Sequence, residues 1–298
     1  MIKRNCKVFL RDRSAVFFSL LSMIIVLLLM IVFLGEMNID NIVGLLKQYA
    51  GERVEAIDKE NAKILVEWWT IAGILVINSV TVSMTVIQVF INDMHEKRIP
   101  SFYITPMKKY LISLSYICSA IIISSFFCSI TFFVAQLYVG IVDNSVLSIM
   151  TSIKAFFMII ICVTVFSVVM YFVTFFVKTP SAWSGMSAII STLVGFVGGI
   201  YLPMGSLQTQ VAEILKYTPI LHGTALMRKI LMQDSLSKTF LDAPAEMVSK
   251  YKEYMGIEVM INNSIITPQF QILFLILCGI IILSITVLLE RKRSLTDR

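Results

Sequence analysis

The chain has 298 residues, of which 57% are hydrophobic and only 15% are charged, and its formal net charge is +6. Soluble globular chains carry about 25% charged residues. The composition therefore excludes an ordinary soluble domain and indicates a membrane protein. Because the basic residues collect at the two ends of the chain and in one short loop, the positive charge is expected to mark a membrane surface, with no role in binding nucleic acid.

Six apolar runs are long enough to cross a bilayer, which takes about 18 or more residues. A Lys, Arg, Asp or Glu near the middle of such a run would cost about 2.5–3.5 kcal/mol, and none occurs there. The sequence therefore predicts an all-α integral membrane protein, a single domain over residues 1–298 with six transmembrane helices. The runs cover residues 14–34, 68–91, 111–139, 153–177, 182–202 and 268–289.

The basic residues also predict the orientation in the membrane. Lys and Arg gather in residues 1–13, in the loop 92–110 and after residue 289, whereas the short segment 140–152 has none. Positively charged residues of short loops stay in the cytoplasm. Both termini and the loop 92–110 are therefore expected to be cytoplasmic, in a plasma membrane.

Two longer segments, 35–67 and 203–267, are expected to lie outside. The first is polar with apolar residues near helical spacing, which predicts an outer amphipathic helix. The second begins with an apolar stretch that Pro and Gly interrupt, and we expect it to form short helices that dip into the outer leaflet. The rest of that segment is expected to form a small water-facing cap.

Motifs that perform chemistry are missing. The chain has no phosphate loop of the form G-x-x-x-x-G-K-[ST] and no G-x-S-x-G elbow, its two histidines are far apart, and its five cysteines include no C-x-x-C pair. We therefore expect no catalytic site, no bound metal and no proton relay through buried acids. The chain alone is not expected to be an enzyme.

Two of the runs contain lines of polar or small residues at helical spacing. Asn78, Thr81, Thr85 and Gln88 share one face of the second run. Small residues, which let helices approach one another, form a similar stripe within the fifth run, at Ser184, Ser187, Ser191 and Gly195. Ordinary packing between helices of one bundle, the wall of a transport path and the seam of a dimer all remain open as interpretations.

A charged stretch, residues 90–111, separates the second and third runs. Within it Ile99, Phe102 and Tyr103 recur at helical spacing, which predicts a short surface helix with one apolar side. Pro106 is expected to end this helix, and the lysines that follow to lie among the lipid headgroups. Such a helix serves either as an interfacial anchor or as a docking site for a soluble partner.

Two blocks of the sequence resemble a known family. They are "DMHEKRIPSFYITPMKKYLISLSY", which begins at Asp93, and "GFVGGIYLPMGSLQTQVAEILKYTPILHGTALMRKIL", which begins at Gly195. With these blocks and its six spans, the chain resembles the permease subunits of ATP-binding-cassette exporters of type V, also called ABC-2-type. That family includes multidrug, antibiotic and lantibiotic exporters, so a role in antibiotic resistance is one expectation.

The resemblance implies roles for particular residues. The loop 92–110 resembles a coupling helix that docks on a separate ATPase, and residues 3–13 resemble a connecting helix that also meets it. Pro100 stands where relatives often have Gly or a polar residue, and we expect it to kink or shorten the coupling helix. The implied ATPase-coupling residues are Asp93, His95, Glu96, Lys97, Arg98, Phe102, Arg11 and Arg13. The implied path or dimer seam consists of Asn78, Thr81, Thr85, Gln88, Ser184, Ser187, Ser191 and Gly195, and the implied outer gate of re-entrant helices contains Gly199, Tyr201, Pro203, Pro219, His222 and Arg228.

The resemblance also implies partners. They are two copies of a cytoplasmic ATPase that binds ATP and Mg, a second permease that is identical or related, and membrane lipid, in a bacterial cell. This chain itself is expected to bind no cofactor. An amphipathic or lipophilic cargo such as a drug, an antibiotic or an antimicrobial peptide is expected; export of sodium or glycan, and a non-transporting sensor or immunity protein, remain as alternatives.

Overall fold

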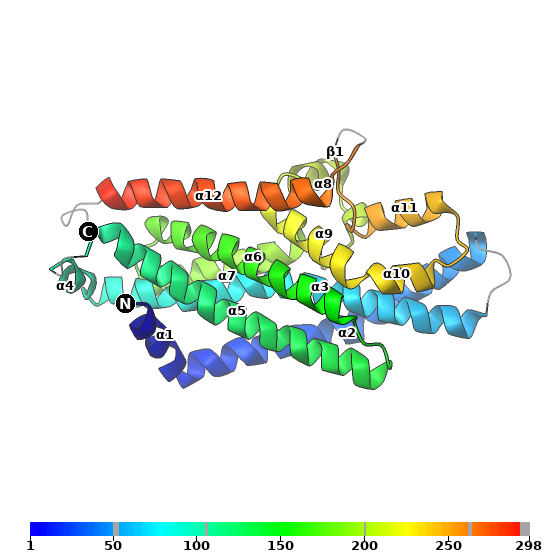
Figure 1. The fold of residues 1–298 in the computed structure, drawn as a ribbon, viewed down its shortest axis with the longest axis horizontal. Helices are drawn as coiled ribbons and strands as arrows, with labels where there is room; N and C mark the ends of the chain where they lie inside the picture. The colour runs from blue at the N-terminus through cyan, green and yellow to red at the C-terminus, as the bar shows by residue number, and fades with distance from the viewer. Residues whose placement is uncertain (50–53, 105–106, 200, 262–263, 293–298) are drawn as a thin grey trace.

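The computed structural model describes the chain except for residues 50–53, 105–106, 200, 262–263 and 293–298. The side chains of residues 22–23, 26–37, 49, 103 and 292 also lie outside the description. The described chain is almost entirely helical (Figure 1). Its β-structure is one hairpin, in which β1 (Met260–Ile261) pairs antiparallel with β2 (Ser264–Ile265).

The long helix α3 (Glu55–His95) is the element around which the bundle packs. Between residues 65 and 91 every side chain of this helix is buried except those of Thr81, Thr85 and Gln88. A helix that is apolar nearly all round must lie inside a larger assembly. The helices packed against it are α2 (Arg13–Tyr49), α5 (Lys109–Val142), α6 (Ile149–Val173), α7 (Pro180–Val197), α9 (Pro219–Leu231) and α10 (Gln233–Thr239).

Small residues let these helices approach α3 closely. Ser83 Oγ lies 2.9 Å from Ser167 Oγ of α6 and 3.3 Å from Ser124 Oγ of α5. On α9, a Cβ atom added to Gly223 would lie 3.3 Å from Cys162 Sγ of α6 and 3.6 Å from Cγ1 of Val76 on α3. Hydrogen bonding between short side chains and close backbone approach are common ways to join helices in lipid.

Five described helices are long and apolar enough to cross a membrane: α3, α5, Ile149–Phe176, α7 and α12 (Pro268–Lys292). The stretch Ile149–Phe176 combines α6 with the 3-10 helix η1 (Thr174–Phe176). Their outer faces expose apolar side chains such as Phe133, Leu277 and Ile281, which suits contact with lipid tails. The chain is therefore an all-α membrane protein. The predicted run 14–34 falls within α2, where most side chains at that depth are not described, so a sixth span stays a prediction.

The fifth predicted run, 182–202, is too long. Helix α7 begins after Thr179, whose hydroxyl accepts a hydrogen bond from the Ala182 amide at 3.2 Å, and it ends at Val197. Gly199 then adopts φ +61°, a left-handed conformation that terminates many helices and that glycine adopts without strain. The chain turns back there and enters the segment 203–267.

The prediction of one outer amphipathic helix over residues 35–67 is wrong. Helix α2 continues to Tyr49 and α3 begins at Glu55, so the segment belongs to two consecutive helices. Ile42 and Leu46 on α2 are buried, as are Ala62 and Leu65 on α3. The apolar spacing read as one amphipathic helix therefore belongs to two helices that continue to pack against each other beyond the predicted spans.

The segment 203–267, named the cap below, consists of short helices, as predicted. They are η2 (Met204–Ser206), α8 (Thr209–Leu215), α9, α10 and α11 (Ala245–Tyr254), followed by the β-hairpin. Helix α9 packs against α3, α6 and α12, and all its side chains from Leu221 to Arg228 are buried. The cap is thus anchored on the bundle by α9.

The two ends of the bundle differ in what they contain (Figure 1). The amino-terminal helix α1 (Ile2–Arg11), the short helix α4 (Ile99–Tyr103) and the last turns of α12 lie at one end, named the terminal end here. The last turns of α2 lie at the opposite end, together with the helices α10 and α11, and this end is named the cap end.

Candidate functional site

The turn after α3 is the most charged feature of the terminal end. Arg98 N donates to Asp93 O at 2.8 Å and Lys97 N donates to Met94 O at 3.1 Å, the pair of bonds that defines a Schellman helix end. Lys97 has φ 56°, at a position where glycine is usual. The backbone of this turn is therefore fully hydrogen-bonded and holds a lysine in a conformation that costs roughly 1 kcal/mol or more.

Below this turn, Asp93 joins three segments. Arg4 of α1 makes a two-pronged ion pair with the Asp93 carboxylate, with Arg4 Nη2 at 2.7 Å from Oδ1, and the Tyr116 hydroxyl of α5 donates to Oδ2 at 2.6 Å. Arg98 lies at the edge of the group, 3.5 Å from Oδ1. The hydrogen bond to Asp93 is the main cause that raises the pKa of Arg4 above its ordinary value. These four residues are named the Asp93 node.

The side chain of Asp93, one of the expected ATPase-coupling residues, is 2% exposed and already bonded to Arg4 and Tyr116, so it supports the turn from inside and its part in coupling stays a prediction. Phe102 is also unsuited to direct docking: it is half-buried against the core, and the Arg4 guanidinium lies 5.3 Å from its ring centroid. Both residues instead hold the turn in place. The remaining predicted coupling residues are exposed, and they are His95, Glu96, Lys97 and Arg98 in the turn and Arg11 and Arg13 where α1 meets α2.

Helix α4 forms the short surface helix that the sequence predicts. It has only five residues, with Ile99 buried and Pro100 in its first turn, where a missing backbone N–H leaves no hydrogen bond unmade. Pro100 therefore starts this helix and does not kink it. The side chain of Tyr103 and the predicted helix end at Pro106 lie outside the described residues.

The polar line of α3 contains the partly exposed side chains of this helix between residues 65 and 91, where all others are buried. Thr81, Thr85 and Gln88 are half-exposed, and Asn78 is buried with an Nδ2 that has no hydrogen-bond partner in the described part of the chain. Ser83, which faces α5 and α6, lies roughly 160° around the axis from Thr81 and Thr85. The strip, named the polar face, therefore points away from α5 and α6.

The small residues of α7 do not all share one environment. Ser184 is exposed, and Ser187 and Ser191 are half-exposed. Gly195 is buried because Tyr201 folds back over it, so that an added Cβ would lie 2.2 Å from the tyrosine ring. Gly195 is therefore covered by a side chain of its own chain, and its place in a path or dimer seam stays a prediction.

At the cap end, Arg228 of α9 joins the ends of two helices. Its Nη2 donates to Gly199 O after α7 at 2.8 Å, and its Nη1 donates to Met255 O at 3.0 Å, just after α11. The guanidinium lies 4.3 Å from the ring centroid of Trp69 on α3, and Trp69 Nε1 also donates to Met255 O at 2.8 Å. We name this group the Arg228 pin.

The charge of Arg228 is fully buried. Carbonyl groups at helix carboxyl ends carry partial negative charge, and an aromatic face attracts a cation. Burial lowers the pKa of Arg228 to about 9, which still leaves it charged at neutral pH. The pin therefore balances a buried cation with backbone dipoles and one indole ring.

The other predicted outer-gate residues surround this pin. Pro203 precedes η2, and Pro219 starts α9. His222 is buried, its Nε2 lies 2.8 Å from Lys216 O, and burial lowers its pKa, which favours the neutral ring. The structure thus brings Gly199, Tyr201 and Arg228 into one neighbourhood, where they hold the turn between α7 and the cap.

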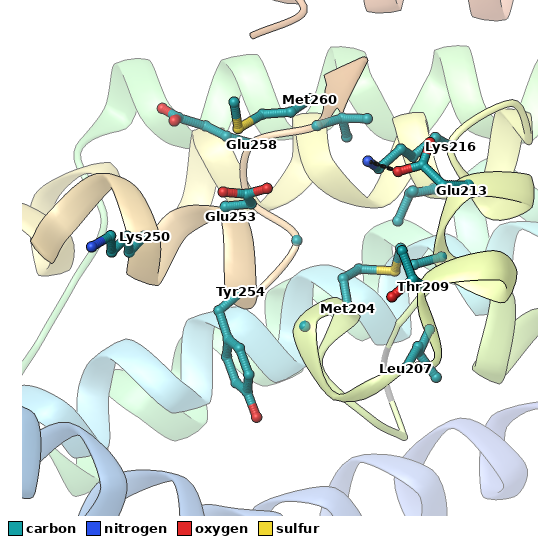
Figure 2. A pocket seen from close by; sticks show the side chains of 15 residues that line it. Met204, Leu207, Thr209, Glu213, Lys216, Lys250, Glu253, Tyr254, Glu258 and Met260 are labelled. Carbon is teal, nitrogen blue, oxygen red and sulfur yellow. Dashed lines mark hydrogen bonds and ion pairs between the residues drawn. The ribbon is translucent and has the colours of Figure 1, made fainter. Parts of the chain in front are cut away.

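A cavity of about 390 Å³ opens in the cap between α8 and α11 (Figure 2). Its lining mixes apolar residues such as Met204 and Leu207 with charged ones, and one wall contains the ion pair of Lys216 with Glu213 at 2.6 Å. It contains none of the predicted site residues. Among the residues that the structure describes, no three His, Cys, Asp or Glu side chains are grouped so as to hold a metal ion.

Several residues of these groups had no signal in the sequence. Arg4 looks like any basic residue of an amino-terminal helix, and its partner Asp93 is 89 positions away. Trp69 looks like an interfacial aromatic residue. Comparison of the chain with protein-family models, with curated proteins and with solved structures finds no match.

The Asp93 node yields a first prediction. Asp93→Asn removes the carboxylate charge and leaves Arg4 without its ion-pair partner, so we expect a loss of about 1–3 kcal/mol, below the 3–5 kcal/mol of a fully buried pair because Arg4 is 30% exposed. Thermal unfolding of the purified protein measures this. Glu96→Gln, at an exposed position of the same turn, should change stability by less than about 0.5 kcal/mol. Equal effects of the two substitutions would contradict the node.

The Arg228 pin yields a second prediction. Arg228→Met removes the side-chain donor to Gly199 O and one of the two side-chain donors to Met255 O, so we expect a loss of about 1–3 kcal/mol, a lower melting temperature and a shift of the tryptophan emission. Arg228→Lys should recover less than half of the loss, because an ammonium lacks the planar fork that reaches both helix ends. Lys229→Met, at the next position, removes a cation outside the pin and is the control. A full rescue by lysine would refute the proposed geometry.

Proposed function

We propose that this chain is the permease half of an ATP-driven exporter in a bacterial plasma membrane. It pairs with a second permease, identical or related, and with two copies of a cytoplasmic ATPase, and it moves an amphipathic or lipophilic cargo outward. The observation that carries the proposal is the terminal end, where a charged, fully hydrogen-bonded turn continues directly from the most buried helix of the bundle.

The turn has the properties of a mechanical contact. Its exposed side chains, Glu96, Lys97 and Arg98, offer both signs of charge to a partner, and Glu96 and Arg98 pair with each other. The Asp93 node fixes the turn to α1 and α5, so a partner that moves the turn also moves these helices. Transmission needs such a stiff link between docking surface and span.

The polar face supports the transport part of the proposal. Asn, Thr and Gln are unfavourable against lipid tails, so a partly exposed strip of them calls for a second subunit or a water-accessible path. Residues 68–91 contain no charged side chain, so the strip offers hydrogen bonds without a fixed charge. This chemistry suits a cargo with a large apolar part better than a free ion.

A charge-swap variant tests the docking role. Glu96→Arg combined with Arg98→Glu keeps the internal ion pair but reverses the charges that a partner meets. Losing the 3.5 Å contact between Arg98 and Asp93 Oδ1 should lower the melting temperature slightly, but we expect the variant to stay folded and to lose most of the ATPase that co-purifies with the tagged chain from its own cells. The matched control is Glu246→Lys combined with Lys250→Glu, which swaps an exposed i,i+4 pair on α11 at the cap end, with Nζ and Oε1 2.7 Å apart.

Two outcomes would refute the docking role. One is a tagged chain that is isolated with no protein containing a phosphate loop, which would favour a sensor or immunity protein. The other is a swap variant that keeps the ATPase as well as the control does, because the turn would then make no charge-dependent contact with the ATPase.

Cysteine chemistry tests the polar face. In a chain whose native cysteines are replaced by serine or alanine, Thr85→Cys should either form a disulfide-linked dimer in membranes or react with a hydrophilic maleimide. Crosslinking indicates a seam between subunits, and reaction with maleimide indicates a water-accessible path. Ser83→Cys, buried on the opposite side of α3, should do neither. A Thr85→Cys chain as inert as the Ser83→Cys chain would leave the polar face as ordinary packing.

A further inference from the structure

Two carboxyl groups meet near the cap end, on segments 76 positions apart in the chain. Glu67 belongs to α3 and Asp143 directly follows α5, and their side chains are 4% and 5% exposed. One lysine serves both: Lys63 Nζ lies 2.6 Å from Asp143 Oδ1 and 3.9 Å from Glu67 Oε1. Two acids and one base therefore share one site, in which both carboxyl groups are buried and the lysine is 39% exposed.

The hydrogen bonding of this site is incomplete if both acids are ionised. Neither oxygen of Glu67, nor Asp143 Oδ2, accepts a hydrogen bond from a donor in the described part of the chain. An ionised carboxylate can only accept, so two of them side by side repel and leave these oxygens unsatisfied. A proton on Glu67 changes this, because its hydroxyl can then donate to Asp143, and the site becomes neutral as a whole.

We propose that Glu67, Asp143 and Lys63 form a proton-operated latch, which holds the loop after α5 onto α3 while Glu67 is protonated and loosens that loop when the proton leaves. The latch concerns the attachment of the segment 143–148 to the bundle, and it operates whether or not the chain transports a cargo.

The surroundings place this latch at the membrane boundary. Glu67 precedes the predicted span 68–91 and is followed by Trp68 and Trp69, residues typical of the interface with water. Burial, and then the neighbouring Asp143, raise the pKa of Glu67 to about 8, and Lys63 opposes the shift. Glu67 is therefore expected to bind and release its proton at a pH of about 8.

Few other ionisable groups face Glu67. Helix α5 contributes Tyr138, whose phenol is near all three latch residues. Helix α2 contributes Lys47, which pairs at 2.8 Å with Glu55, the first residue of α3. Three charged residues lie on the start of α6 and on α10, and all are exposed: Lys154, Asp234 and Lys238.

The sign of the pH effect follows from the raised pKa. An unfolded glutamate releases its proton near pH 4.5, whereas folded Glu67 retains it up to a pH of about 8. Between these values the folded chain binds more protons than the unfolded chain, so stability is greatest at the acidic end and falls as pH rises.

Thermal unfolding and hydrogen exchange test the latch in the purified, full-length protein. We expect the melting temperature to fall by several degrees between about pH 5 and pH 8.5, and amide exchange at 143–148 to accelerate beyond its intrinsic pH dependence. Glu67→Gln, a neutral side chain of the same shape that can still donate to Asp143, should keep the segment protected and remove most of this pH dependence.

Glu60→Gln is the matched control, an exposed glutamate on the same helix, and it should retain the full pH dependence of the unaltered chain. Asp143→Asn is a second probe: it removes the like charge without a large change of shape, and it should also flatten the pH profile. The latch is refuted if the unaltered protein shows no extra exchange at 143–148 on the alkaline side, or if Glu67→Gln and Glu60→Gln have the same profile.

Discussion

The structure depends on the burial of α3 along nearly its whole length. An unmatched charge or hydrogen-bonding group is costly in a helix enclosed by neighbours, and polar residues near the two ends of α3 have dedicated partners. Asp93 obtains Arg4 and Tyr116 at the terminal end, and Trp69 obtains Met255 O and Arg228 at the cap end. These two clamps lie 24 residues apart, about 36 Å along the helix axis, close to the thickness of a bilayer core.

This arrangement makes α3 a stiff rod that is attached at both ends and partly exposed along one strip. The Asp93 node ties it to α1 and α5, and the Arg228 pin ties it to the cap through the ends of α7 and α11. A displacement of the charged turn therefore cannot be absorbed locally by bending, because close packing resists it. It has to appear as movement of the rod relative to its neighbours, and the polar face is the side of the rod with partly exposed side chains.

The sequence predicted the features that depend on local patterns and missed those that depend on distant partners. Apolar runs predicted the long helices, and spacing placed Thr81, Thr85 and Gln88 on one face, because both follow from helix geometry alone. The burial of Asp93 could not be predicted, since charge alone does not reveal that Arg4 reaches it. The covering of Gly195 could not be predicted for the same reason, because the ring of Tyr201 reaches it only after the turn at Gly199.

At the cap end, the surroundings of each buried ionisable group decide which of its protonation states is stable. Arg228 stays ionised in the interior because two backbone carbonyls and an indole face surround its guanidinium, although its Nε has no hydrogen-bond partner in the described part of the chain. Glu67 has no such surroundings: its near neighbours are one like-charged acid and a lysine that this acid already engages. Its environment is complete only when it binds a proton. The first group therefore serves as a permanent fastener of the cap and the second as a reversible one, although both lie against the same stretch of α3.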